Sequence, residues 1–369
     1  MKLQILQENL DKAVSIASRF ASPKAQLPIL GNVLISTQKS KIFISATNLE
    51  MSVSVGVGAK VEEDGEISIP AKVIAELISN LPKDTITLSS EKEQLKVSTS
   101  VFSSTVLGMD ATDFPEIPNS VNKNGSVSIL KKDLVEALSQ VSFSASLDET
   151  RPVLTGVLFI WRRNELTLVA TDGFRLSKKK LKVDGIEKES RQILPKSVLS
   201  EVARSNDGNE ADILFSLQEK DKQIIFGIGE TVLTSRLLEG DYPDFEKIIP
   251  KNPPIKILVD KEEFLRAVKL ASIFARDAAN VVKIIVLKEN LKIVAESGQS
   301  GSQETKVDEK VEGITPDFEI SFNFRFLEEF IHSVNGEEVK MEFSTTTAAG
   351  IFTDSSDSNY LHLIMPVRV

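Results

Sequence analysis

Residues 3–18 read LQILQENLDKAVSIAS, a short strand of alternating apolar and polar residues followed by a turn and an amphipathic helix. The same pattern returns at residues 127–142, which read VSILKKDLVEALSQVS, and at residues 256–272, which read KILVDKEEFLRAVKLAS. Self-similarity at a fixed period indicates a structural unit that is repeated along the chain. These segments therefore predict three copies of one domain.

Other segments recur in the same order within each copy. Two strands flank a polar turn in ISATNLEMSV, LVATDGFRLS and IVAESGQSGS, where Ala46, Ala170 and Ala295 are in register at steps of 124 and 125 residues. A second strand and helix follow in GEISIPAKVIAELIS, RQILPKSVLSEVARS and FEISFNFRFLEEFIHS. Pro70 and Pro195 hold equivalent positions there, where proline suits the first helical turn.

Clusters of turn residues separate the copies, namely NSVNKNG at residues 119–125 and PKNPP at residues 250–254. We therefore expect domains at residues 1–122, 123–252 and 253–369. Each copy contains two helices and many short strands. This content predicts an α+β fold in which two helices pack on antiparallel sheet.

The composition is that of an ordinary globular protein, with 41% hydrophobic and 26% charged residues among 369. No run reaches the about 18 consecutive apolar residues that a membrane span needs, and the N-terminus MKLQILQENL lacks a signal-peptide core. The absence of cysteine fits a reducing compartment, so the expected location is the cytoplasm. A formal charge of −9, taken alone, argues against nucleic acid and favours an enzyme.

The ingredients of an enzyme are nevertheless thin. His332 and His362 are far from metal-ligand spacing, and without cysteine no zinc pattern remains. Gly227-Ile228-Gly229 has no following glycine or helix that would make a dinucleotide loop, and no G-x-S-x-G motif is present. We therefore predict no catalytic residue, no metal and no cofactor.

The helices combine one apolar face with a more basic face. Leu10, Ala13, Val14 and Ala17 follow the spacing of a buried helical face, and Phe264, Leu265, Val268 and Ala271 repeat it in the third copy. The basic residues of the helices are Lys12, Arg19, Lys72, Lys131, Lys132, Lys196, Arg204, Arg266, Lys269 and Arg325. Acidic residues stand on the same helices, so for any one helix an ordinary solvated face is the better explanation, and helix charge alone does not establish DNA binding.

Several segments together resemble the DNA polymerase III beta subunit family, the bacterial sliding clamps, along the whole chain. They include LPILGNVLIS from Leu27, ATNLEMSV from Ala46, VATDGFRLS from Val169, YPDF from Tyr242 and the terminal MPVRV from Met365. The combination of TDGFRL with a C-terminal MPxR is specific, and the threefold repeat agrees with it independently. An enzyme is then the rival class, and a β-rich scaffold without DNA a third.

The resemblance implies a closed ring of two chains joined head to tail, which encircles double-stranded DNA without sequence specificity and has no catalysis of its own. It implies as partners the DNA polymerase III alpha subunit, the clamp loader, repair polymerases and mismatch-repair proteins. The basic helix residues would face DNA, together with Lys24, whereas Asp148, Pro152 and Val153 depart from relatives at other DNA-contacting positions. The dimer contact would join Phe102 and Val106 to Ile273 and Phe274 of the partner, although burial in the core is an equally good explanation for these residues.

The resemblance also implies a pocket between the second and third copies, which takes a short peptide with leucine and aromatic anchors. The implied pocket residues are Arg151, Leu154, Thr171, Gly173, Phe174, Arg175, Leu176, Pro243, Lys247, Ile248, Leu363, Ile364, Met365, Pro366, Val367 and Arg368. Aliphatic side chains would form the groove and arginines at its rim would hold peptide carbonyls or carboxylates. Relatives often have histidine at the position of Phe174. Thr171-Asp172-Gly173 also reads as a hairpin turn, because Asp-Gly favours type I′.

Overall fold

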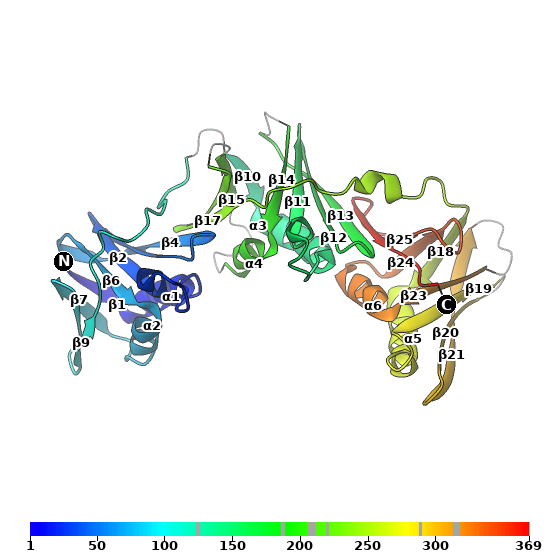
Figure 1. The fold of residues 1–369 in the computed structure, drawn as a ribbon, viewed down its shortest axis with the longest axis horizontal. Coiled ribbons are helices and arrows are strands. Elements are labelled where there is room, and N and C mark those ends of the chain that lie inside the picture. The colour runs from blue at the N-terminus through cyan, green and yellow to red at the C-terminus, as the bar shows by residue number, and fades with distance from the viewer. Residues whose placement is uncertain are drawn as a thin grey trace. The chain divides into compact units, whose positions relative to one another are not determined.

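The structure is a computed structural model that describes residues 1–122, 126–185, 189–205, 212–218, 221–287, 290–312 and 318–368. Each repeat contributes two helices to the described residues (Figure 1). The helices are α1 (Gln7–Ser18), α2 (Ala71–Ser79), α3 (Lys131–Val141), α4 (Lys196–Arg204), α5 (Lys261–Ala275) and α6 (Phe324–Ser333).

Short strands make up most of the remaining structure. The first repeat contributes β1 (Lys2–Leu6), β2 (Asn32–Gln38), β3 (Lys41–Thr47), β4 (Met51–Gly58), β5 (Lys60–Glu63), β6 (Glu66–Pro70), β7 (Thr85–Glu91), β8 (Gln94–Ser98) and β9 (Ser103–Leu107). The second contributes β10 (Val127–Leu130), β11 (Gly156–Arg162), β12 (Glu165–Thr171), β13 (Arg175–Lys182), β14 (Ser190–Pro195), β15 (Asp212–Gln218), β16 (Gln223–Ile228) and β17 (Thr231–Arg236). The third contributes β18 (Ile255–Asp260), β19 (Val281–Val286), β20 (Leu291–Ser297), β21 (Gly301–Val307), β22 (Glu309–Glu312), β23 (Phe318–Asn323), β24 (Glu338–Phe343), β25 (Gly350–Asp354) and β26 (Tyr360–Ile364).

Each repeat builds the same two groups of four antiparallel strands. In strand order these groups are β1-β7-β8-β9 and β6-β2-β3-β4, then β10-β15-β16-β17 and β14-β11-β12-β13, then β18-β24-β25-β26 and β23-β19-β20-β21. The first and third repeats add the short edge strands β5 and β22. The predicted α+β fold with three copies of one domain is confirmed.

The sheets continue across the boundaries between repeats. Strand β4 of the first repeat pairs with β17 of the second, and β13 of the second repeat pairs with β26 of the third. As a result the chain forms two compact units that do not coincide with the repeats. Unit 1 contains Met1–Lys132 and Ser197–Leu237, and unit 2 contains Asp133–Lys196 and Leu238–Val369.

The apolar helix faces predicted from the sequence are buried. Leu10, Ala13, Val14 and Ala17 of α1 have at most 1% of their surface exposed, which leaves the polar face of this helix to solvent. The corresponding residues of α5 join the core of the third repeat, a cluster rich in phenylalanine that lies between its helices and strands. Pro70 and Pro195 end strands β6 and β14 and directly precede helices α2 and α4, one residue earlier than expected.

The first helix of each repeat is tied to the end of the second helix through its first residue. Gln7 Nε2 donates to the carbonyl of Ile78 and Lys261 Nζ donates to that of Val334, each at 2.8 Å. Lys131 holds the same position in the second repeat and donates to the carbonyl of Ser205. Carbonyls at a helix C-terminus lack partners within the helix, so a side-chain donor, especially a cation, stabilises them.

Lys131 is therefore a correction to the sequence analysis, which assigned it a DNA-facing role. The side chain is buried, with 6% of its surface exposed, and its ammonium donates to the carbonyl of Ser205. The neighbouring Lys132 is exposed.

Candidate functional site

A cavity of about 200 Å³ lies in unit 2, where β12, β13 and β26 meet the segment before β18. It is lined by Leu154, Thr171, Gly173, Phe174, Arg175, Leu176, Pro243, Asp244, Phe245, Ile248, Leu363 and Met365. Ten of these residues are among the predicted pocket residues. Asp244 and Phe245 are not, although both belong to the YPDF segment that contributed to the family resemblance.

The cavity has an apolar floor and a wide apolar mouth. Leu154, Leu176, Leu363 and Phe245 are buried, with at most 6% of their surface exposed. At the mouth Phe174 is 66% exposed, and Ile248 and Met365 are exposed at 47% and 38%. Large exposed apolar side chains around a concave apolar floor are typical of a surface that binds another molecule.

Some predicted pocket residues do not line the cavity. Ile364 is fully buried in the core of the third repeat, because successive side chains of a strand point to opposite faces and Leu363 takes the cavity side. The prediction for Ile364 was wrong for this reason. The other residues outside the lining are Arg151, Lys247, Pro366, Val367 and Arg368.

Two of these residues, Lys247 and Val367, bind other residues of unit 2. Lys247 forms an ion pair with the lining residue Asp244 at 2.9 Å, which raises the pKa of Lys247 and lowers that of Asp244. The backbone N–H of Val367 donates to the carbonyl of Ser321 at 2.8 Å and so attaches the C-terminal segment to β23.

A turn held by side chains positions one wall of the cavity. The Asp172 carboxylate accepts hydrogen bonds from the N–H groups of Phe174 (2.9 Å) and Arg175 (3.0 Å). The Thr171 hydroxyl donates to the carbonyl of Arg175 at 2.6 Å and accepts from the N–H of Gly173 at 3.0 Å. Only Gly173 has a positive φ, of 93°, so the turn is not the type I′ turn that Asp-Gly predicted.

The first repeat builds the same turn from different residues. Asn48 accepts from the N–H groups of Glu50 and Met51, and the Thr47 hydroxyl donates to the carbonyl of Met51 and accepts from the N–H of Leu49. Leu49, at the position of Gly173, has a φ of 72°, a conformation that costs a bulky residue energy. The turn is thus a property of the repeat, and its two polar residues decide its shape.

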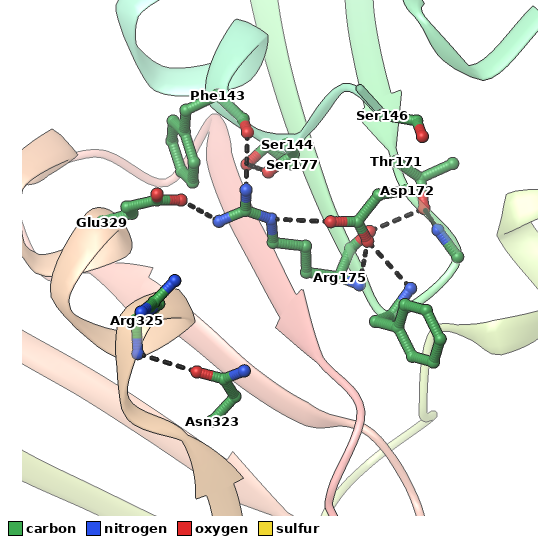
Figure 2. A network of polar contacts seen from close by, with 12 residues as sticks. Phe143, Ser144, Ser146, Thr171, Asp172, Arg175, Ser177, Asn323, Arg325 and Glu329 are labelled. Atoms are coloured by element: carbon green, nitrogen blue, oxygen red, sulfur yellow. Dashed lines mark hydrogen bonds and ion pairs between the residues drawn. The ribbon is translucent and has the colours of Figure 1, made fainter. Parts of the chain in front are cut away.

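The Arg175 side chain is turned away from solvent, with 9% of it exposed (Figure 2). Its Nε donates to the Asp172 carboxylate at 3.0 Å, Nη2 donates to the carbonyl of Phe143 at 2.8 Å, and Nη1 is ion-paired with Glu329. The guanidinium carbon lies 4.5 Å from the ring centre of Phe326, within cation–π range. Arg175 thus lines the cavity as expected, while its side-chain donors connect the turn to α6 and to the carbonyl of Phe143 after α3.

His362 lies on the inner face of the same strand pair, where it is fully buried. Its Nδ1 is 2.7 Å from the Ser177 hydroxyl, which is 2.8 Å from the Ser144 hydroxyl, and its ring stacks on Phe330 with centres 5.2 Å apart. Burial, and secondly the charge of Arg175, lower the pKa of His362 far below its ordinary range. The ring is therefore neutral at physiological pH.

Family models match the chain in three consecutive parts. They describe the N-terminal, central and C-terminal domains of the DNA polymerase III beta subunit and match residues 1–118, 128–244 and 246–368. A beta sliding clamp of Staphylococcus aureus is 30% identical over 358 residues, 94% of each chain. The chain belongs to the bacterial beta sliding clamp family.

Solved structures of sliding clamps have the same fold. The clamp of Bacillus subtilis superposes with a TM-score of 0.94 at 25% identity, covering 100% of this chain and 99% of that one. The beta subunit of Thermotoga maritima superposes with a TM-score of 0.90 at 26% identity over the same shares. The family is a non-catalytic processivity factor of DNA polymerase III, which confirms the interpretation that the chain is not an enzyme.

Within the described residues no three His, Asp or Glu residues are grouped so as to hold a metal ion. No helix in the described part of the chain has the length and apolar character that crossing a membrane requires.

Nine of the helix and loop cations that the clamp family implied as DNA-facing are exposed. They are Lys12, Arg19, Lys24, Lys72, Lys132, Arg204, Arg266, Lys269 and Arg325. Lys196 is half-buried, and its loss of solvent, followed by the charge of Arg175, lowers its pKa. Lys12, Arg19 and Arg204 line one groove of unit 1, where Glu201 binds Arg19 at 2.9 Å and Arg204 at 3.0 Å.

The predicted dimer residues differ in exposure. Ile273 of α5 is 59% exposed and Phe274 and Phe102 are half-buried, whereas Val106 is only 7% exposed because it pairs with Leu95 inside its own sheet. Further exposed apolar residues are Val101 (83%), just before β9, Leu107 (69%), the last residue of β9, and Val73 (48%) of helix α2. Val73 was not among the residues of the expected contact.

Proposed function

We propose that two copies of this chain join head to tail into a ring that encircles duplex DNA and tethers its partners through the cavity of unit 2. The single observation that carries this proposal is the pairing rule between repeats. The last strand of the second group in one repeat pairs with the last strand of the first group in the next repeat, as β4 does with β17 and β13 with β26. By the same rule β21 and β9 lack a junction partner among the described strands of the chain, and each lies at the edge of its sheet.

The two internal junctions share one register, which predicts the register between copies. The N–H of Arg236 donates to the carbonyl of Glu50, and the N–H of Met365 donates to that of Phe174, at equivalent positions of the two junctions. In the β8–β9 hairpin the N–H of Gly108 donates to the carbonyl of Glu93, and in the β16–β17 hairpin the N–H of Leu237 donates to that of Lys222. Gly108 and Leu237 are therefore equivalent positions of the two hairpins. Applied to β21 of one copy and β9 of the other, the same register pairs Gly301 with Val106, Ser302 with Thr105, Gln303 with Ser104 and Glu304 with Ser103.

Such a closed ring removes two exposed sheet edges, which would otherwise pair non-specifically. A repeated head-to-tail contact of two chains is an allowed symmetric assembly. Ile273 and Phe274 of one copy would then lie against the β9 edge of the other, where Leu107 and Val101 supply apolar surface. We propose the three repeats, residues 1–122, 123–252 and 253–369, as the domains of this ring.

A ring replaces affinity with topology. Non-specific electrostatic binding gives dissociation constants of only about 10⁻⁴–10⁻⁶ M at physiological salt, too weak to hold a polymerase for long. A chain of charge −9 can serve this function because only the surface that faces DNA needs to be basic. We assign that surface to the nine exposed cations and Lys196, without Lys131.

The cavity of unit 2 is the proposed docking site for short peptides with leucine and aromatic anchors. Its apolar floor suits such anchors, and an affinity near micromolar, about −8 kcal/mol, lets partners exchange. The proposed partners are the DNA polymerase III alpha subunit, the clamp loader, repair polymerases and mismatch-repair proteins. No cofactor is needed, and we propose the cytoplasm as the location.

Cross-linking tests the register of the ring. The chain has no cysteine, so the pair Thr105→Cys and Ser302→Cys introduces the only thiols. We expect rapid oxidation to a covalent dimer, because directly opposite residues of antiparallel strands lie within disulfide range. The pair Thr105→Cys and Glu304→Cys is the control, since a shift of two residues separates the thiols; faster cross-linking of this control would reject the register.

Retention on DNA tests the ring itself. A clamp loaded by its ATP-driven loader should stay on nicked circular DNA and be lost when the circle is cut, because only an end releases a closed ring. The measurement is the amount that co-elutes with DNA before and after linearisation. Equal loss from both forms would reject topological retention.

A further inference from the structure

One face of the sheet β14-β11-β12-β13 carries a cluster of cations, here called the basic face, that the ring and the cavity do not use. On β13 the side chains of Leu176, Lys178, Lys180 and Lys182 alternate with those of the opposite face. The pairing places Lys180 in a row with Arg191 and Lys182 in a row with Glu165 and Arg162. The basic face consists of Arg162, Lys178, Lys180, Lys182 and Arg191, and Glu165 is the one carboxylate that shares it on these strands.

Most of this charge is not neutralised within the described residues. Glu165 pairs with Lys180 at 3.0 Å. Arg162, Lys182 and Arg191 are exposed and form no ion pair with any residue that the structure describes. Lys178 has a lowered pKa because of burial and, secondly, of Lys180, as expected where cations crowd together. A local excess of positive charge is unusual on a chain of net charge −9.

The basic face begins where the cavity ends. Leu176 lines the cavity, and Lys178, two residues further along β13, has its ammonium 5.8 Å from the ring centre of Phe245, another lining residue. Each same-face step along a strand covers about 6.6 Å, so Lys182 lies about 20 Å from Leu176. The segment with Tyr242 and Phe245 crosses the sheet between Leu176 and Lys182, because Tyr242 Oη donates to the carbonyl of Val169 at 3.4 Å.

We propose that the basic face binds an acidic segment of the same partner whose apolar anchors occupy the cavity, an inference that rests on the proposed peptide-binding function. The segment leaves the cavity, passes over the turn Phe245–Ile248 and lays its carboxylates on Lys182, Arg162 and Arg191. A linker of about six to ten extended residues spans this distance. Anchoring in the cavity keeps the acidic segment at high effective concentration, so individually weak ion pairs contribute to affinity.

The pattern of charges favours a peptide over nucleic acid. Glu165 lies within the basic face, and Asp244 and Glu246 lie on the segment that borders it. A continuous phosphate backbone would meet these carboxylates, whereas a peptide can place its acidic residues singly. The neutral residues in the same rows, Thr167 and Ile160, offer no aromatic ring on which a base could stack.

Synthetic peptides test the proposal by fluorescence anisotropy with the full-length chain. One peptide carries only leucine and phenylalanine anchors, and the others extend it at either end by a glycine–serine spacer and four Glu, Gln or Lys residues. We expect the Glu extension at one end to bind about fivefold more tightly than Gln at low salt, the Lys extension to bind more weakly, and high salt to remove both differences.

Variants locate the effect. Arg162→Gln/Lys182→Gln/Arg191→Gln should abolish the gain from Glu without changing the affinity of the anchor-only peptide. The matched control Lys60→Gln/Lys96→Gln/Arg236→Gln removes three exposed cations of unit 1 and should keep the gain. Failure of the anchor-only peptide to bind rejects the proposed function of the cavity. The role of the basic face is overturned if the anchor-only peptide binds normally but the Glu extension adds no affinity. It is also overturned if the triple variant keeps the gain from Glu and loses oligonucleotide binding instead.

Discussion

Arg175 is a cavity residue whose side chain serves another purpose. Its guanidinium connects the turn at Asp172, the carbonyl of Phe143 and helix α6 through Glu329 (Figure 2). Because the guanidinium is only 9% exposed and each of its nitrogens has a partner, the network holds the Arg175 side chain in one position. The cavity wall is therefore held in place by residues that do not line the cavity.

Substitution of Arg175 by glutamine should destabilise the protein and weaken peptide binding together. The change leaves Asp172 and the Phe143 carbonyl without their partner, which costs about 2–4 kcal/mol of unfolding free energy. Urea unfolding followed by circular dichroism measures the loss. Arg325→Gln on the exposed face of α6 is the control, with an expected change within about 0.5 kcal/mol; equal effects of both changes would contradict the proposed role of the network.

His362 predicts a pH dependence of stability. Its folded pKa is lowered by burial, whereas the unfolded chain binds a proton at an ordinary histidine pKa of about 6.5. The neutral ring therefore favours folding above about pH 6.5, and stability falls as the pH decreases below this value, by up to about 1.4 kcal/mol per pH unit. The difference in unfolding free energy between pH 7.5 and 5.5 should be smaller in His362→Asn. A variant that removes the other histidine, His332, provides the comparison. If the unfolding free energy of His362→Asn depends on pH as steeply as that of the unmodified chain, the dependence does not come from His362.

At the scale of elements, two features recur between repeats. In the first and second repeats the turn between the last two strands of the second group is held by a Thr and an Asx side chain, at Thr47-Asn48 and Thr171-Asp172. The first residue of each first helix binds the end of the second helix in all three repeats.

The two turns provide a matched pair of substitutions. Asn48→Ala and Asp172→Ala each remove the acceptor of two backbone N–H groups, a loss of about 1–2 kcal/mol of stability, and Asp172→Ala should cost more because it also removes the partner of Arg175 Nε. Only Asp172→Ala should also weaken binding of the anchor-only peptide, because only that turn lines the cavity. Titration of both variants with the same peptide checks this; equal affinity would mean that the turn does not shape the site.

Lys131 and Lys132 form a second pair. Lys131→Met removes the donor to the Ser205 carbonyl from a buried position and should cost about 2 kcal/mol. Lys132→Met changes an exposed residue and should leave stability within about 0.5 kcal/mol. Unfolding free energies measure both, and retention of DNA by Lys131→Met should equal that of the unmodified chain, in contrast to the original interpretation of this residue.

At the scale of the whole molecule, we expect the repeat to determine how copies associate. Three repeats give two internal junctions and leave β9 and β21 at the edges of their sheets. The expected native mass is about 81 kDa, twice the 40.6 kDa of one chain. Sedimentation equilibrium measures it.

A charge placed at the free junction should break the dimer. Ile273→Asp introduces a carboxylate at a 59%-exposed apolar position of α5, and burying it unpaired against β9 of the other copy is costly. We expect a folded monomer that no longer stays on circular DNA. Leu147→Asp, at an 89%-exposed position in unit 2, should remain a dimer; a dimeric Ile273→Asp chain would place the contact elsewhere.

The sequence by itself determined the repeats, the fold class and the buried helix faces, which depend on local spacing such as the apolar period of α1. Most of the cavity lining was expected only from the resemblance to the clamp family, since no local spacing brings Leu154, Leu176 and Leu363 together. The tertiary structure alone decided that Lys131 is buried, that Ile364 faces the core, that Arg175 is bound from behind and that Asp244 and Phe245 complete the cavity. Each of these depends on partners far away in the sequence, and the side on which a strand residue lies follows from strand pairing, which local composition does not specify.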